Sequence, residues 1–469
     1  MCTDRSGGVF VTWYAEGSPA GDGYYYGIHI ISDGSMVGPV VLIDTEDDYG
    51  NVSLESAGNA FATIVWKQGG FGTENIYAQR IRANYDTNTI NKLWNEGNPL
   101  DVATYDGRQI SPKVTYFSDD FVAVVWEHWP SPSTSSIAGN LISLTGELQF
   151  QSDGISDVIY TLDYPTTSFP RVKATSLGAF VVWLSADDKH YVQKFSPNNM
   201  NEWSTPILLE TQGTQEQARL SADANGGVYV TWEDDNSIAI QYLDSNGNIS
   251  ISEPVISDIN TEQFSPLVRA DSDKGAFVVW AKGAANINGI GTATLEYEYI
   301  DIELGSGLEE GYASLFYGFG GQIEKGSTKT THFDNNNNLI YWQDYRNGVN
   351  NPQTFGGYGG ASEFESIKLL SEYPYQNSPQ IVKMDENTFF LGFYNQDEQV
   401  YFQLLDNELN EIGEAEAVNE NGNQQASDDS QPFIASNGLG TVYYAYSENP
   451  GFGDIYVQKY NDVGNAEWD

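Results

Sequence analysis

Three features of the sequence predict an all-β repeat fold. A short segment of alternating β-branched or aromatic residues ending in Trp recurs at spacings from 48 residues (Trp232 to Trp280) to 62 residues (Trp280 to Trp342). Each copy is followed by a second alternating segment and by turns rich in Asn and Gly, and no stretch carries a sustained helical period. Four short strands per unit of about 50 residues are typical of propeller blades. The sequence therefore predicts a single large β-propeller of eight or nine four-stranded antiparallel blades.

The residue that ends each recurring segment is called its anchor. A four-stranded sheet cannot bury both of its faces alone, so stacked blades need large residues between them. Burying one such side chain should contribute about 1.5–3 kcal/mol, and we expect the anchors to be structural rather than ligand-binding. The nine predicted anchors are Trp13, Trp66, Trp126, Trp183, Trp232, Trp280, Trp342, Tyr394 and Tyr446.

The predicted propeller spans 1–469 as nine units. The first unit lacks most of its opening strand and the ninth ends before its last strand, so a ring of nine blades, a ring of eight with an unpaired end and a propeller cut from a longer protein all remain open. Several opening strands are expected to begin at a Ser-Pro pair, as at Ser111 and Ser378. A split into two domains near the irregular units six and seven is an alternative. The units are about 1–50, 51–108, 109–166, 167–214, 215–262, 263–322, 323–374, 375–424 and 425–469.

Charge and cysteine content restrict the partners. The chain has 65 acidic and 21 basic residues, a net charge of −44, which disfavours nucleic acid and anionic membrane surfaces. No run of 18 apolar residues is present, so no membrane span is predicted. Cys2 is the only cysteine, which suits the cytosol but also a large exported fold that needs no disulfides. No signal peptide is present in this chain, and we expect an upstream segment to be missing.

Two units carry a recognisable motif. Unit two reads NIYAQRI at 75–81 and LWNEGNPL at 93–100, and unit seven reads WQDYRNG at 342–348. These segments resemble the W-x-D-x-R … DIYAQ-(R/K) … W-x-x-x-G repeats of exported bacterial propeller proteins, many of which resemble type IX secretion cargo and surface adhesins. The resemblance implies an extracellular or cell-surface location and a scaffold, and it implies no particular reaction. The C-terminal sorting domain typical of such cargo is absent from this chain.

Motifs for catalysis are missing. The sequence has no Asp box of the sialidase type, no HExxH, no G-x-S-x-G and no Walker loop, and a single cysteine excludes thiolate zinc sites. Carboxylates near the anchors leave open a polysaccharide-active enzyme, a glycosidase or lyase, because two acids facing the central channel could act as a pair. These candidate acids are Glu127, Glu233, Asp234, Asp235 and Asp344.

One turn has the spacing of a cation ligand. Asp244, Asn246 and Asn248 place side-chain oxygen atoms at alternate positions, as at the start of a calcium loop. The same residue types suit an ordinary hairpin turn. No cofactor is therefore expected, with calcium as the possible exception.

The loops that follow the anchors hold aromatic side chains suited to binding. An aromatic ring beside a polar loop can stack on a sugar, and loops carry function where a rigid scaffold presents them. We expect these residues to surround the mouth of the central channel, although capping of blade edges is an equal alternative. The candidates are Phe71, His128, Trp129, Tyr345, Arg346, Phe355, Tyr358 and Phe452.

The sequence thus favours an exported, non-catalytic binding or adhesion module for a glycan or protein ligand. The polysaccharide-active enzyme and a structural subunit of a larger secreted or cell-surface assembly are the alternatives. The oligomeric state is open, either a monomer or part of a larger chain.

Overall fold

The computed structural model describes most of the chain, and in that part every regular element except one short 3-10 turn, η1 (Asn95–Gly97), is a β-strand. The protein is therefore all-β, as predicted. The described residues are 2–3, 8–16, 23–31, 35–45, 49–58, 60–117, 120–151, 153, 157–162, 169–209, 211, 213–249, 255–256, 263–270, 275–285, 290–301, 321–324, 329–332, 338–344, 352–359, 364–397, 399–418, 433–436, 440–447 and 455–467.

Each repeat contributes up to four strands, numbered along the chain. The first strands are β1 (Cys2–Thr3), β5 (Tyr49–Gly58), β10 (Arg108–Tyr116), β14 (Arg171–Thr175), β18 (Gln215–Ala222), β22 (Gln263–Ala270), β26 (Lys329–His332), β30 (Asn377–Lys383) and β34 (Phe433–Ser436). The second strands, which carry the anchors, are β2 (Val9–Glu16), β6 (Phe61–Gln68), β11 (Phe121–Ser131), β15 (Gly178–Leu184), β19 (Val228–Asp234), β23 (Gly275–Ala285), β27 (Asn338–Asp344), β31 (Thr388–Tyr394) and β35 (Val442–Ser447).

The third and fourth strands complete the sheets. The third strands are β3 (Gly23–Ile30), β7 (Asn75–Asn84), β12 (Thr134–Ser143), β16 (His190–Phe195), β20 (Ser237–Leu243), β24 (Ile290–Asp301), β28 (Gln353–Gly359), β32 (Val400–Asp406) and β36 (Ile455–Tyr460). The fourth strands are β4 (Met36–Thr45), β8 (Thr89–Lys92), β13 (Val158–Leu162), β17 (Ile207–Leu208), β21 (Val255–Ile256), β25 (Gly321–Glu324), β29 (Phe364–Leu369) and β33 (Glu411–Ala417). A further strand, β9 (Leu100–Ala103), pairs with β7.

Strands that follow one another in the chain pair antiparallel, so each repeat folds as its own meander. Five sheets have four strands in chain order, as in β10-β11-β12-β13, and the last sheet has three described strands, β34 to β36. Strands β22 to β29, from two consecutive repeats, share one eight-stranded sheet, because Ile323 of β25 pairs with Asp344 of β27. The described residues thus form eight sheets that carry nine anchor strands.

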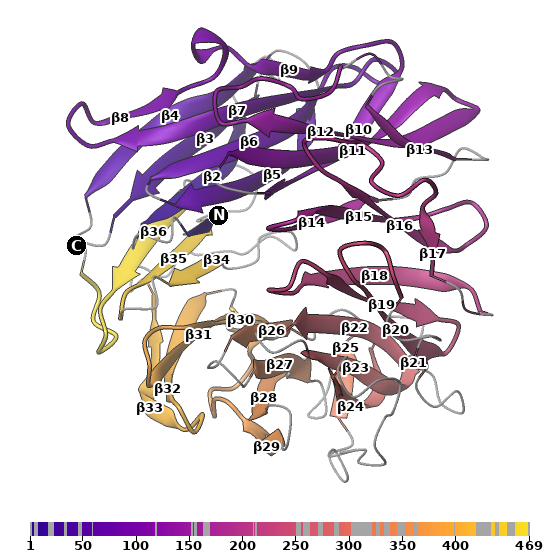
Figure 1. Cartoon of the computed structure of the whole chain (residues 1–469). Helices are drawn as coiled ribbons and strands as arrows, with labels where there is room; N and C mark the ends of the chain where they lie inside the picture. The colour runs from indigo at the N-terminus through magenta and orange to yellow at the C-terminus, as the bar shows by residue number, and fades with distance from the viewer. Residues whose placement is uncertain are drawn as a thin grey trace.

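The sheets stand around a centre with their first strands innermost (Figure 1). Contacts join β1 to β5, β10 to β5 and β14, β18 to β14 and β22, and β30 to β26 and β34. The fourth strands β8, β13, β17, β21, β29 and β33 lie at the periphery (Figure 1). The ring closes where the two ends of the chain meet, because β1 also contacts β34. There Val11 and Ile30 of the first sheet pack with Ala435 and Tyr443 of the last. The architecture is a β-propeller.

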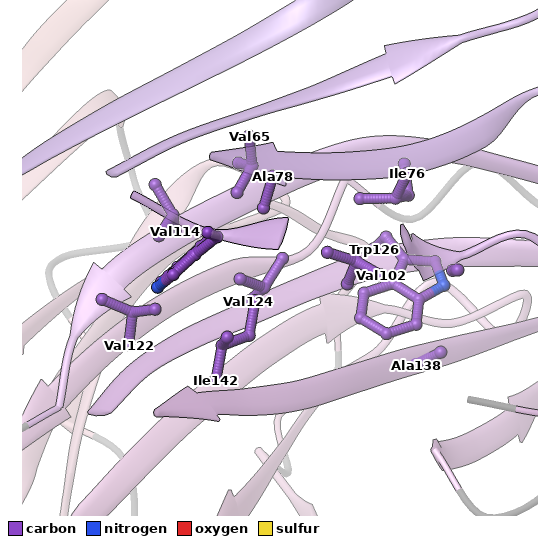
Figure 2. Packing of buried hydrophobic residues seen from close by; sticks show 12 residues of the cluster. Val65, Ile76, Ala78, Val102, Val114, Val122, Val124, Trp126, Ala138 and Ile142 are labelled. Carbon is purple, nitrogen blue, oxygen red and sulfur yellow. The ribbon is translucent and has the colours of Figure 1, made fainter. Parts of the chain in front are cut away.

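The anchors fill the interfaces between successive sheets, as predicted. Trp66, Trp126 and Trp232 are 0% exposed, and Trp183 and Trp280 are 1% and 5% exposed. Figure 2 shows one interface, where Trp126 of β11 lies among aliphatic side chains from its own sheet and from the preceding one. Trp13 is half-buried, and the side chain of Trp342 lies outside the described residues.

The eighth anchor was predicted one residue too late. The anchor of several sheets stacks on an aromatic residue opposite it in the third strand, and in the eighth repeat this partner, Tyr401, lies opposite Phe393 rather than Tyr394. Phe393 also faces the preceding sheet, as the other anchors do, whereas Tyr394 faces the following one. Successive side chains of a strand alternate between faces, so a Phe-Tyr pair read without its register cannot identify the anchor. The stacked pairs, with ring centroids 5.7 to 6.2 Å apart, are Trp13–Tyr26, Trp66–Tyr77, Trp183–Tyr191, Phe393–Tyr401 and Tyr446–Tyr456.

The Ser-Pro pairs mark bulges inside the first strands, which corrects the expectation that they open them. The pairing of β10 with β11 jumps from Ile110 to Lys113, and Ser111 at the bulge has a φ of 57°. In β30 the pairing jumps from Asn377 to Gln380, and Ser378 has a φ of 51°. Proline has no N–H to donate to the ladder, so a bulge is where an inner strand tolerates it.

Buried glutamines explain part of the recurring motif. Gln79, from the YAQ segment of β7, accepts a hydrogen bond from the backbone N–H of Trp94 (2.9 Å) and donates to the carbonyl of Asn98 (2.6 Å). Gln193 of β16 binds both backbone groups of Trp203 in the same way. These side chains satisfy the backbone of the turns that precede β9 and β17, where no ladder partner exists.

A second set of buried glutamines lies two residues before the bulges. Gln215 accepts from the N–H of His190 (2.6 Å) and donates to the carbonyl of Leu209 (2.6 Å), both in the preceding sheet. Gln376 accepts from the N–H of Thr354 (3.0 Å) in the sheet before it. These side chains therefore fasten each crossover to the preceding sheet.

The closure interface should be essential to stability. Tyr443 is 1% exposed in this interface, so Tyr443→Ala should lower the free energy of unfolding by about 3–5 kcal/mol because it leaves a large cavity. Phe71→Ala, which removes an aromatic side chain that is 86% exposed, is the matched control and should change it by less than about 1 kcal/mol. Denaturant titration measures both. Amide exchange should show β2 and β35 losing protection together, and unchanged exchange in both strands would contradict the closure.

Candidate functional site

The structure describes only part of the predicted binding set. Phe71, His128, Trp129 and Phe355 are described with their side chains, and Tyr358 is described in its backbone only, on β28. The remaining predicted residues, Tyr345, Arg346 and Phe452, lie outside the described residues.

Phe71 is the most exposed of the large hydrophobic side chains described, at 86%. It lies in the loop between β6 and β7, and the guanidinium carbon of Arg108 lies 4.3 Å from the centroid of its ring. Arg108 begins β10, the first strand of the next repeat. A cation over an aromatic face is worth about 0.5–1 kcal/mol when exposed, so the contact orients the ring without covering it.

Arg108 is itself fixed by Glu74. Nε and Nη2 of Arg108 donate to the Glu74 carboxylate at 2.8 to 3.1 Å, in a forked arrangement. Burial alone would raise the pKa of Glu74, but hydrogen bonds from Arg108 and from backbone N–H groups, that of Gly72 included, hold this pKa below its usual value. The carboxylate stays ionised at neutral pH, and the fork keeps the guanidinium plane in one orientation.

Trp129 lies beside this pair, near the end of β11. It is opposite Arg108 in the register of β10 and β11 and is partly exposed. Its Nε1–H donates to Oε2 of Glu127 at 3.3 Å. Gly107 permits this packing, because a Cβ there would lie 2.4 Å from the Trp129 carbonyl oxygen and its φ is 102°.

Glu127 links Trp129 to a third aromatic residue. Glu127 is 0% exposed, and its Oε1 accepts the backbone N–H of Phe169 at 3.0 Å. Phe169 is 67% exposed. Phe71, Arg108, Trp129 and Phe169, from three successive repeats, are therefore linked through Glu74, Glu127 and the pairing of Arg108 with Trp129, and Phe169 takes part through its backbone N–H. We call these four residues the aromatic platform.

Sequence reasoning found two members of the platform and missed the others. Phe71 and Trp129 follow anchors, whereas Arg108 begins the first strand β10 and Phe169 lies just before the first strand β14, and the prediction treated these strands as structural. One signal was available, since Phe169-Pro170 occupies the position of a Ser-Pro pair with a large apolar residue in place of Ser.

His128 lies beneath the surface. It is 3% exposed, and its ring lies edge-on to Tyr105 with centroids 4.7 Å apart. Gln109 Nε2 lies 3.2 Å from its Nδ1. Burial lowers the pKa of His128 to about 4, so the imidazole is neutral at physiological pH and supports the platform from below.

Phe355 is also buried, at 7%, and it lies opposite Trp342 in the register of β27 and β28. Tyr358 lies opposite Leu339 in the same pair of strands. The structure therefore places both residues in a sheet and not in the loop where they were expected, because β28 extends from Gln353 to Gly359.

The predicted calcium turn is a closed hairpin turn. Oδ1 of Asp244 accepts the N–H groups of Asn246 and Asn248 at 2.8 Å each, and its Oδ2 accepts Nδ2 of Asn248 at 2.9 Å. Asp406 makes the same bonds with Asn410. Within the described residues no group of three or more His, Cys, Asp or Glu side chains is positioned to hold a metal ion. Calcium binding at Asp244 stays a prediction.

Carboxylates near the fifth anchor bind the adjacent loop. Oδ1 of Asp234 accepts the hydroxyl of Thr211 at 2.5 Å, and Oδ1 of Asp235 accepts the N–H of Thr214 at 2.9 Å. Glu233 is 5% exposed, and the side chain of Asp344 lies outside the described residues.

In the described part of the chain there is no helix long and apolar enough to cross a membrane.

The neutral, buried histidines predict that the stability of the fold depends on pH. The folded pKa of His128 and of His190 is lowered by burial to about 4, from an ordinary 6.5. The unfolded chain therefore binds protons first as pH falls, and the stability contributed by the neutral ring is present above pH 6.5 and lost toward pH 4. Lowering the pH from 7 to 5 should reduce the free energy of unfolding by about 1–2 kcal/mol for each histidine. Denaturant titrations should show a shallower pH slope for His128→Gln, and an unchanged slope would contradict the assignment.

Comparison with known proteins bears on the fold. No protein-family model and no curated protein matches the sequence. A solved structure described as the eukaryotic initiation factor matches with a TM-score of 0.53 and 9% identity, over 97% of this chain and 94% of that chain. The BP39L lectin from Burkholderia pseudomallei matches with a TM-score of 0.46 and 10% identity, over 79% and 99%. The WD40 domain of SCAP from fission yeast matches with a TM-score of 0.40 and 8% identity, over 97% and 98%. At these identities the likeness concerns the propeller fold alone.

Proposed function

We propose that this protein is a binding module that takes a glycan on the aromatic platform. The observation that carries the proposal is Phe71, an aromatic side chain 86% exposed and yet oriented by Arg108, which Glu74 fixes in turn. Leaving such a ring in water forgoes about 1.5–3 kcal/mol of burial free energy. A ligand that covers the ring would recover this free energy without first having to order the side chain.

The chemistry of the platform suits a sugar. Phe71, Trp129 and Phe169 offer apolar ring surface for the C–H face of a pyranose, while Arg108 offers hydrogen-bond donors beside it. The supporting groups are rigid, because Glu127 and Glu74 are 0% and 2% exposed. Rigid aromatic anchors with a few placed polar groups are the usual composition of a binding site.

We also propose that the protein acts outside the cell or at its surface, as an adhesin would. The likeness of 75–81 and 342–348 to repeats of exported propellers supports this, and the net charge of −44 is compatible with a soluble exported protein. Antibody labelling of intact cells of the source organism should detect the protein. Labelling only after lysis would overturn the location and leave the glycan proposal standing.

A glycan array followed by calorimetry tests the binding function. The full chain should bind at least one glycan, and Phe71→Ala and Trp129→Ala should each weaken that binding about tenfold or more, since truncating a central aromatic contact costs at least about 1.4 kcal/mol. Glu74→Gln should weaken it less, because the ring remains while Arg108 loses its clamp.

Ile412→Ala is the matched control, since Ile412 is an exposed apolar residue (44%) on the peripheral strand β33, and it should leave the affinity unchanged. Absence of glycan binding by the full chain, or equal affinities for all the variants, would refute the proposal. Shortening of the bound glycan during incubation would instead identify the enzyme alternative.

A further inference from the structure

Basic residues recur at one position of the innermost strands. The position lies opposite the residue before the anchor in the second strand, and in the repeats whose first strand has a bulge it immediately follows that bulge. It is occupied by Lys113, Arg171, Arg219 and Lys329 in four repeats, and by uncharged residues in the four other repeats where it is described. No acidic residue occupies it in the described chain.

The next position on the same face continues the trend. Two residues further along each first strand lie Lys173 and Arg269, and the one acidic residue at this position among the described repeats is Glu55. These two rows thus hold six basic residues and one acidic residue, in a chain with 21 basic and 65 acidic residues. The charge balance of these two rows on the first strands is thus the reverse of that of the whole chain.

The intervening residues establish which way these side chains face. Val114 and Val172, between the two rows, are both 8% exposed and pack into the core against the preceding sheet. Side chains of a strand alternate, so the rows face away from that core. Lys113 and Arg171 are exposed to solvent, and because β10, β14 and β18 are innermost (Figure 1), they reach solvent at the inner edge of the ring. We call Lys113, Arg171 and Arg219 the basic belt.

The charges of the belt act on one another. Desolvation by the surrounding protein, and then the charge of Arg171, lower the pKa of Lys113. Desolvation and then the charge of Arg219 lower the pKa of Arg171 to about 10. Like charges that are held close together and partly desolvated repel one another.

The belt has little compensation from the protein. Among the residues that the structure describes, no carboxylate forms an ion pair with Lys113 or Arg171. Arg219 is nearest to compensation, since its Nη1 donates to the carbonyls of Gln217 and Ala218, and Glu233 acts on it at longer range. Placing three repelling cations at equivalent positions is unfavourable for folding, so the arrangement calls for a ligand that neutralises it.

The belt adjoins the aromatic platform. Phe169 precedes Arg171 by two residues, which is about 7 Å along an extended strand, and Arg108 and Lys113 lie on the same strand β10. A ligand seated on the platform can therefore extend onto the belt from the same end of the ring.

We propose that the basic belt binds the carboxylate or sulfate groups of an acidic glycan whose neutral faces rest on the aromatic platform. This inference rests on the proposed glycan-binding function and names the class of glycan. Guanidinium groups bind both oxyanions through paired hydrogen bonds. The overall charge of −44 opposes the ligand only at long range, because salt at physiological strength screens exposed charges beyond about 8 Å.

Calorimetry with an oligogalacturonate and its methyl ester tests the belt, because esterification removes the charge of each carboxylate and adds only one methyl group to it. The full chain should bind the acid at least tenfold more tightly than the ester, and less tightly as salt is raised. Arg171→Gln should weaken binding of the acid about tenfold or more and leave the ester within twofold. Arg171→Lys, which keeps the charge, should retain part of the preference. A sulfated neutral oligosaccharide then distinguishes sulfate from carboxylate.

Two controls separate the belt from its surroundings. Arg82→Gln removes an exposed arginine of β7 outside the belt and should change neither affinity. The melting temperature of Arg171→Gln should equal or exceed that of the unmodified chain, because the substitution removes a repulsion. Equal affinities for acid and ester, an equal loss in Arg82→Gln, or tighter binding of an acidic peptide or single-stranded DNA would overturn the inference.

The platform and the belt fail in distinguishable ways. Phe71→Ala should weaken acid and ester alike, since the ring does not sense charge. If Phe71→Ala leaves both affinities unchanged while the chain still prefers the acid, the platform proposal is overturned and the belt proposal stands. If Phe71→Ala weakens binding of both ligands but the chain shows no preference for the acid, the belt proposal is overturned and the platform proposal stands.

Discussion

The packing of one large aromatic side chain between successive sheets is the interaction on which the whole ring depends. Each anchor whose side chain is described packs against the preceding sheet, and in several repeats it stacks on an aromatic residue of its third strand. A meander of four strands buries too little apolar surface to stand alone. The ring then closes through the same kind of contact, made by Tyr443 against the first sheet.

Buried glutamines carry the polar part of this architecture. The glutamine of the third strand holds the turn behind it, and the glutamine before the bulge holds the crossover from the preceding sheet. Both sets satisfy backbone groups that a sheet ladder cannot reach, and an unsatisfied buried group would cost about 1–3 kcal/mol. The recurring motif of the sequence is therefore largely a set of structural requirements, which is why it predicts the fold well and a ligand poorly.

The proposed binding residues lie where the repeats differ from one another. The residue with positive φ in or just before the first strand differs between repeats, as Ser111 and Phe169 show. The residue of the first strand that lies opposite the one before the anchor also differs, from Arg171 to the uncharged Leu267. Platform and belt thus occupy positions at which the repeats differ, and the belt lies on the innermost strands β10, β14 and β18 (Figure 1).

The sequence by itself determined the all-β class, the repeat and the burial of the anchors, because these depend on alternation and spacing within about 50 residues. It also identified Phe71 and Trp129, which stand out as aromatic residues in polar loops. Only the tertiary structure decided that Phe393 rather than Tyr394 is the anchor, since pairing across strands sets which face a residue takes. It alone brought together Arg108, Trp129 and Phe169 from different repeats. It alone showed that basic side chains lie near one another in a chain of negative net charge, because spacing along the sequence does not predict which residues of different repeats are neighbours in the ring.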